Sequence, residues 1–211
     1  MTTTGTLLLG LILGMRHATD PDHVLAISTM VSRDPRLGRA VRMGLFWGVG
    51  HTMTVLGVGV LMLLCGVTVP PRAVRAMDLA VALMLIGLGV ASLRARIAAP
   101  DATPSLAEGI LVSPVRPLLV GIVHGLAGSA SVTLLALTTI PDKAGALFYL
   151  GLFGVGTVAG MLVITGGFAL SLTFSGNVSR SLPRLVTRLS GALSVTAGIV
   201  FAAQSLMVSR T

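Results

Sequence analysis

The sequence predicts an all-α membrane protein with six transmembrane helices, arranged as two inverted three-helix repeats. Apolar residues make up 54% of the 211 positions, only 10% are charged, and the mean hydropathy is +0.94. These values lie far from the balance of an ordinary soluble domain. The second observation is a series of long apolar segments separated by charged or proline-containing stretches. The third is an internal repeat.

A membrane-spanning helix needs about 20 consecutive, mostly apolar residues. Six segments of this kind follow one another, at approximately 5–31, 41–65, 75–95, 115–139, 144–173 and 184–208. Almost nothing is left for a soluble domain, so we expect a single transmembrane domain over 1–211. The first segment has neither a basic leader nor a small-residue cleavage site, and we therefore expect it to be retained.

The formal net charge of +8 is better explained by membrane topology than by nucleic-acid binding. Ten basic residues fall in the first, third and fifth connections between the segments, whereas four fall on the opposite side. Because Lys and Arg are enriched on the cytoplasmic side, we expect the odd-numbered connections inside and both termini outside the cytoplasmic (inner) membrane. The lipid bilayer is then the expected partner, and nucleic acid is not.

An internal repeat relates the two halves of the chain. A shift of 107 residues places GMRHATD, from Gly14, on GIVHGLA, from Gly121, and a shift of 106 places WGVGHT on FGVGTV. Three helices per half is an odd number, so the halves must insert in opposite orientations, as in many secondary transporters. We expect repeats over 1–96 and 114–211, joined by a linker at 97–113. Glycines spaced four apart would bring helices close together and would permit a homodimer.

The segment HATDPDH, residues 17–23, places four ionisable side chains inside the first apolar segment. Each aspartate near the bilayer centre costs about 2.5 to 3.5 kcal/mol, so we expect it to be paired or solvated. Pro21 lacks the N–H that would bond the carbonyl of His17, so the first helix should kink or unwind there. An unwound turn could direct all four side chains toward a common centre. The alternative is that they pair with Arg16 and water at the outer mouth.

Two further histidines lie at membrane depth. His51, in GVGHTMTV, is roughly ten residues into the second segment, and we expect it to bind metal or to orient a ligand. His124, in VHGLAGSAS, is the repeat counterpart of His17 and either lines the path or packs, because Ala127 and Ser129 replace the two aspartates. Imidazole and carboxylate ligands suit Ni²⁺, Co²⁺ or Zn²⁺ rather than Ca²⁺ or Mg²⁺. The predicted metal site comprises His17, Asp20, Asp22, His23, His51 and His124.

The segment RHATDPDHV resembles the His-x4-Asp-His signature of the nickel/cobalt transporter family, with His17, Asp22 and His23 at the three positions. GVGHTMTV is similar to the second motif of that family, Gly-His-Ser/Thr, around His51. GIVHGLAGSASV is closer to the short, urease-accessory-like membrane proteins related to the family. The resemblance implies selective passage of Ni²⁺ or Co²⁺ across the cytoplasmic membrane, with the signature residues as essential metal contacts.

We therefore expect a secondary transporter for Ni²⁺ or Co²⁺, working in uptake, that is not an enzyme and holds no prosthetic group. Metal loading should release protons, because histidine must be neutral to bind a cation. The chain has no Gly-x4-Gly-Lys-Ser/Thr loop, so we do not expect it to hydrolyse ATP. Open alternatives are metal efflux and a non-transporting accessory role in nickel-enzyme maturation. An intramembrane serine protease built on Ser129 would leave Asp20 and Asp22 unexplained.

Overall fold

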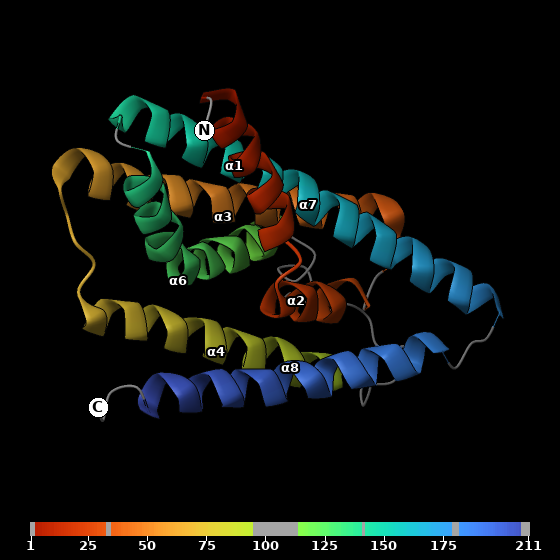
Figure 1. The fold of residues 1–211 in the computed structure, drawn as a ribbon. Helices are drawn as coiled ribbons and strands as arrows, with labels where there is room; N and C mark the ends of the chain where they lie inside the picture. The colour runs from red at the N-terminus through yellow and green to blue at the C-terminus, as the bar shows by residue number, and fades with distance from the viewer. Residues whose placement is uncertain (1–2, 33–34, 95–113, 141, 179–181, 208–211) are drawn as a thin grey trace.

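The computed structural model describes residues 3–32, 35–94, 114–140, 142–178 and 182–207. Within these ranges every regular element is a helix (Figure 1). The helices are α1 (Thr3–His17), α2 (Pro21–Val31), α3 (Leu37–Cys65), α4 (Pro71–Arg94), α6 (Val115–Thr139), α7 (Lys143–Val178) and α8 (Leu182–Met207). The predicted linker at 97–113 lies outside the described residues.

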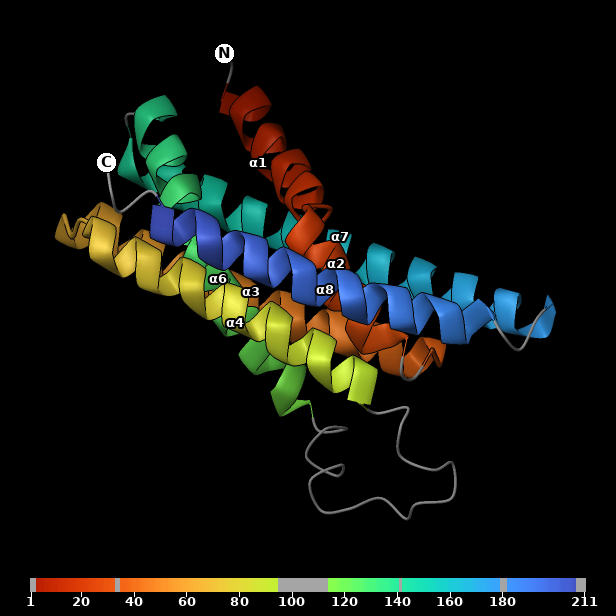
Figure 2. The ribbon, with the colours of Figure 1, turned by 90° about the horizontal axis from the view of Figure 1, so that it is seen from below.

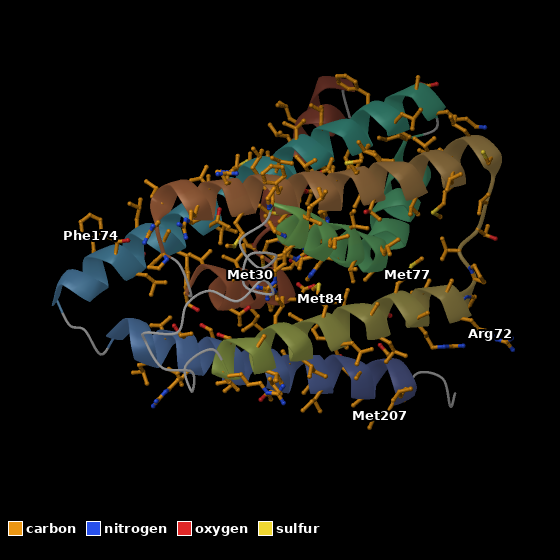
Figure 3. The ribbon with its side chains drawn as sticks, turned by 180° about the vertical axis from the view of Figure 1, so that it is seen from behind. Met30, Arg72, Met77, Met84, Phe174 and Met207 are labelled. Carbon is orange, nitrogen blue, oxygen red and sulfur yellow. The ribbon has the colours of Figure 1, made fainter. Side chains whose placement is uncertain are left out.

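Four of the described helices are long and apolar enough to cross a membrane, over Leu37–Cys65, Pro71–Arg94, Lys143–Phe174 and Leu185–Met207. Large apolar side chains cover their outer surfaces. Phe174 and Met207, labelled in Figure 3 toward the ends of α7 and α8, are 68% and 69% exposed. An apolar exterior on helices of this length is suited to lipid contact, so the chain is an all-helical membrane protein.

The prediction of an all-α membrane protein is thus confirmed, whereas six spans are not established. Among the residues whose side chains are described, the apolar stretches of α1 and α6 cover Leu8–His17 and Val115–Ala127, and the α6 helix itself continues to Thr139. α2 has only 11 residues. The extent of α6 agrees with the predicted segment 115–139, and α4 begins a turn earlier than its predicted segment.

The helices form two groups joined by α2 (Figure 1). In the first group α3 packs on α6 and α7, and α1 packs on α7; in the second, α4 packs along α8. α2 contacts α4, α7 and α8 and so lies between the groups. The colours of Figure 1 show that α3 and α4 run in opposite directions, as do α7 and α8. Figure 2 shows the α4–α8 pair in front, with α1 inclined to the long helices.

Glycines bring the central helices together backbone to backbone. A Cβ added at Gly14 of α1 would collide with the carbonyl oxygen of Phe153 in α7. A Cβ added at Gly121 of α6 would collide with the carbonyl oxygen of Trp47 in α3. The two contacts are repeat counterparts, because a shift of 107 residues relates Gly14 to Gly121 and a shift of 106 relates Trp47 to Phe153. The same shifts relate the contact of Gly50 with Leu118 to the contact of Gly156 with Leu11. A shift of 109 residues relates the contact of Gly89 with Gly191 to the contact of Gly198 with Ala82.

The first apolar segment is broken beside Pro21, as the sequence predicts. α1 ends at His17, and α2 begins with Pro21, a position at which a helix does not need the missing N–H. Asp20 between them has an extended backbone, with φ −59° and ψ 145°. Its N–H donates to the His17 carbonyl at 3.0 Å, so the carbonyl at the end of α1 keeps a partner. The break turns the side chains on either side of it toward α3 and α6.

Candidate metal centre

All six side chains predicted to form a metal site lie in one connected cluster. α1 contributes His17 at its last residue, the following turn contributes Asp20, and α2 contributes its first-turn residues Asp22 and His23. α3 contributes His51 and α6 contributes His124. The chain has four histidines, and every one of them belongs to this cluster. Four helices therefore bring their histidines to one place. Histidines that served only in packing would be expected at scattered positions.

His17, His23 and His51 form the first group, in which one nitrogen from each ring lies within 4.8 Å of the other two. The Nε2 atoms of His17 and His51 are 3.2 Å apart. His23 and His51 are each only 1% exposed. The Nε2 atom of His23 is buried and has no hydrogen-bond partner in the described part of the chain. A buried nitrogen without a partner is costly unless a ligand or ion satisfies it.

Asp20 lies behind His17 rather than between the histidines. Its Oδ2 is 2.7 Å from Nδ1 of His17, and because a carboxylate only accepts, Nδ1 must donate. The neutral ring then carries its lone pair on Nε2, the atom that faces His51. Carboxylates in this position orient metal-binding histidines and raise their basicity. The Asp20 side chain is 47% exposed, so its carboxylate lies at the edge of the cluster rather than inside it.

Asp22, His23 and His124 form the second group, whose ligand atoms also lie within 4.8 Å of one another. Nε2 of His124 donates to Oδ2 of Asp22 at 2.8 Å. Nδ1 of His23 donates to the other oxygen of the same carboxylate at 3.2 Å, as does the His23 backbone N–H at 3.0 Å. These contacts fix the ring of His23, with Nδ1 on Asp22 and Nε2 without a hydrogen-bond partner among the described residues.

Two aromatic side chains frame the cluster, and the sequence analysis did not identify either. The Trp47 ring is stacked on His23, with centroids 5.8 Å apart and planes 11° apart. Phe153 lies 5.4 Å from His17, centroid to centroid. Both residues occupy matching places in WGVGHT and FGVGTV, and that match is the sequence signal that could have identified them. Both rings therefore pack directly against imidazoles of the cluster.

The donor set defines what the cluster can bind. Imidazole nitrogens with one or two carboxylate oxygens suit Ni²⁺, Co²⁺ and Zn²⁺, and they are poor ligands for Ca²⁺ and Mg²⁺. No thiolate is available nearby, because the single cysteine, Cys65, is exposed at the far end of α3. The buried, unpartnered Nε2 of His23 fits a site built to receive a cation.

Comparison with known proteins gives one informative match. The chain is 32% identical over 202 residues to the urease accessory protein UreH of Bacillus sp. (strain TB-90). The match covers 92% of this chain and 88% of that protein. No protein-family model and no solved structure matches the chain.

Proposed function

The chain belongs to the family of the urease accessory protein UreH, and from this premise we propose that it is a secondary transporter for Ni²⁺ or Co²⁺. The ion is bound in transit by His17, His23 and His51. Two carboxylates orient the rings, Asp20 behind His17 and Asp22 behind His23. The metal is cargo rather than a resident cofactor, and the chain catalyses no chemical reaction. The metal ion moves through the cytoplasmic membrane into the cell.

One observation carries the proposal. Three buried or partly buried histidines from three helices bring their nitrogens within 4.8 Å of one another, at a break in an apolar helix. Broken helices that expose backbone and polar side chains at the centre of a helical membrane protein are typical of secondary transporter sites. The Nε2 atom of His23 is buried without a hydrogen-bond partner among the described residues, and a bound cation would satisfy it.

The proposal includes two inverted repeats that move against each other. The matched contacts of Gly14 on Phe153 and Gly121 on Trp47 support it, because inverted repeats place equivalent residues in equivalent surroundings. The ring contacts follow the same relation, since His17 packs on Phe153 and His124 packs on Trp47. Rocking of one repeat against the other would expose the site to each side in turn. Release requires moderate rather than maximal affinity.

The name of the relative favours a second candidate, a non-transporting accessory in urease maturation. Urease is a nickel enzyme, so an accessory role and nickel supply are compatible functions of one membrane protein. A metal cluster that stores or presents Ni²⁺ would need the same ligands but no passage. Efflux would need the same passage in the opposite direction. The Ser129 side chain, on which the protease alternative depends, lies outside those that the structure describes.

Metal flux through the purified chain separates these functions. Liposomes that contain only this protein should take up Ni²⁺ or Co²⁺ faster than empty liposomes. The variants His17→Ala, Asp22→Ala and His23→Ala should carry metal no faster than the empty liposomes, because each removes a ligand or its orienting partner. Asp78→Asn is the matched control, since this carboxylate lies on α4 beside Arg75 and Phe201, away from the cluster.

Two results would contradict the transporter. Unchanged flux in all three cluster variants would show that the metal does not pass through these residues. Binding of Ni²⁺ by the wild-type chain without any flux would favour the accessory role.

A further inference from the structure

We infer that the metal centre offers one ion two overlapping positions that share His23. The first position is formed by His17, His23 and His51, and the second by Asp22, His23 and His124. The use of the two positions in passage rests on the proposed function, whereas their coordination chemistry does not.

His23 stands between the two positions. Its ring centroid is 4.7 Å from that of His17 and 4.2 Å from that of His124. Nδ1 lies 3.2 Å from Asp22, and Nε2 is buried without a hydrogen-bond partner among the described residues, so we assign Nδ1 to the second position and Nε2 to the first. One side chain thus serves both positions through opposite atoms. Transfer between them would keep His23 as a ligand but would exchange the nitrogen through which it binds the ion.

A neutral imidazole has a lone pair on only one nitrogen, so the two positions exclude each other. When the ion binds Nε2 of His23, Nδ1 keeps its proton and donates to Asp22. When the ion binds Nδ1, the Nδ1 proton is released to water, Nε2 takes up a proton from water, and the Asp22 carboxylate becomes a ligand. The ring stays neutral in both states. The chain should therefore hold one ion at a time.

The second position has one unsatisfied nitrogen of its own. His124 is 2% exposed, and its Nδ1 is buried without a hydrogen-bond partner among the described residues. Its Nε2 is directed at Asp22, as a ligand of the same ion would be. The two positions lie beside different helix contacts, since His17 contacts Phe153 where α1 meets α7 and His124 contacts Trp47 where α6 meets α3. Transfer from one to the other moves the ion from the α1–α7 contact to the α6–α3 contact.

Co²⁺ binding to the full-length chain in detergent tests the two positions, because the visible absorption spectrum of bound Co²⁺ depends on its ligands. The wild type should bind one Co²⁺ per chain. His51→Ala should still bind Co²⁺, about 10- to 100-fold more weakly and with an altered spectrum, because the ion then occupies the second position. Adding His124→Ala to His51→Ala should abolish this binding. His17→Asn, which alters a partly exposed ligand of the first position, should reproduce the spectrum of His51→Ala in a second folded variant.

The rival arrangement is a single site in which His124 only supports Asp22. It is indicated if His51→Ala and His17→Asn, both shown to be folded by their thermal unfolding, bind no Co²⁺. A single site that includes both His51 and His124 as ligands is indicated if His124→Ala changes the wild-type Co²⁺ spectrum as strongly as His51→Ala does. Either result overturns the second position.

Flux through liposomes tests the role of the second position in passage. His124→Ala should load Co²⁺ with the wild-type spectrum but carry it about tenfold more slowly or worse. Asp78→Asn should match the wild type in both measurements, because it lies outside the cluster. Wild-type flux through His124→Ala would overturn the transfer step. Wild-type liposomes without flux would contradict the proposed function instead, and the spectra would still decide whether the second position exists.

Discussion

Asp20 and Asp22 stand two residues apart but have different contacts. Asp20 accepts from Nδ1 of His17 on the outer side of the cluster, whereas Asp22 accepts from both His23 and His124 inside it. The difference arises at Pro21, because the extended backbone of Asp20 precedes it and the helical backbone of Asp22 follows it. On one continuous helix Asp22 would have pointed away from the other three side chains.

The carboxylate of Asp20 should strengthen metal binding without touching the metal. Asp20→Asn keeps the size of the side chain but removes the charge that orients His17 and increases its basicity. We expect Co²⁺ affinity to fall about 10- to 100-fold in equilibrium titrations. Asp78→Asn should leave the affinity unchanged. Equal affinities in Asp20→Asn and the wild type would show that His17 needs no partner on Nδ1.

Metal binding should weaken as the pH falls. Protons and the metal ion compete for the same imidazole nitrogens, and a protonated ring has no lone pair to offer. Over the acidic range in which the imidazoles take up protons, the apparent Co²⁺ affinity should decrease as the pH falls, and each binding event there should release protons. Titrations at several pH values in buffers of different ionisation enthalpy measure both quantities. An affinity independent of pH over this range would argue against histidine ligands.

The sequence predicted the composition of the cluster better than its internal contacts. Spacing and Pro21 were sufficient to group the side chains of residues 17–23, because these interactions are local. His124 could be assigned only through the internal repeat, which left its role open. The stacking of Trp47 on His23 depends on how α2 lies against α3, and no local pattern encodes that angle. For the same reason the two overlapping groups could not be read from the sequence.

At the scale of elements, close backbone contacts determine where the histidines meet. α1 and α6 approach α7 and α3 closely because glycines leave no side chain at the contact. The sequence predicted this from glycines spaced four residues apart. It could not predict which helix each glycine faces, since that depends on the packing of all the helices.

Adding a methyl group at these contacts should destabilise the fold. Gly121→Ala would place a Cβ against the backbone of Trp47, and we expect a loss of about 1–3 kcal/mol in the free energy of unfolding. Gly151→Ala in α7 is the matched control, because an added Cβ meets no described atom within 4 Å there. It should be neutral or slightly stabilising, since alanine favours helix. Thermal unfolding in detergent compares the two, and equal midpoints would contradict the close contact.

At the scale of the whole molecule, charge distribution predicts the orientation in the membrane. The chain has one cysteine, Cys65, which is exposed at the end of α3 and is expected on the outer side. A membrane-impermeant maleimide should therefore label it in intact cells. In a Cys65→Ser/Gly38→Cys variant, the exposed new thiol at the opposite end of α3 should be labelled only after the cells are opened. The reverse labelling pattern would invert the topology.

The overall class followed from composition, but the number of spans did not. Hydropathy measures only how apolar a segment is, and on that measure residues 5–31 were predicted to form one span. The structure divides that segment into α1 and α2, two helices that are each too short to span alone. The predicted repeat boundaries at 96 and 114 fall within or beside residues outside the described ranges.

An anomalous difference map from Co²⁺-soaked protein would test most directly whether the histidine cluster binds a divalent transition ion. We predict one strong peak among His17, His23 and His51, at about 2.0–2.2 Å from a nitrogen of each ring. The peak should be lost in His23→Ala. An empty cluster in crystals that bind Co²⁺ elsewhere would contradict the account.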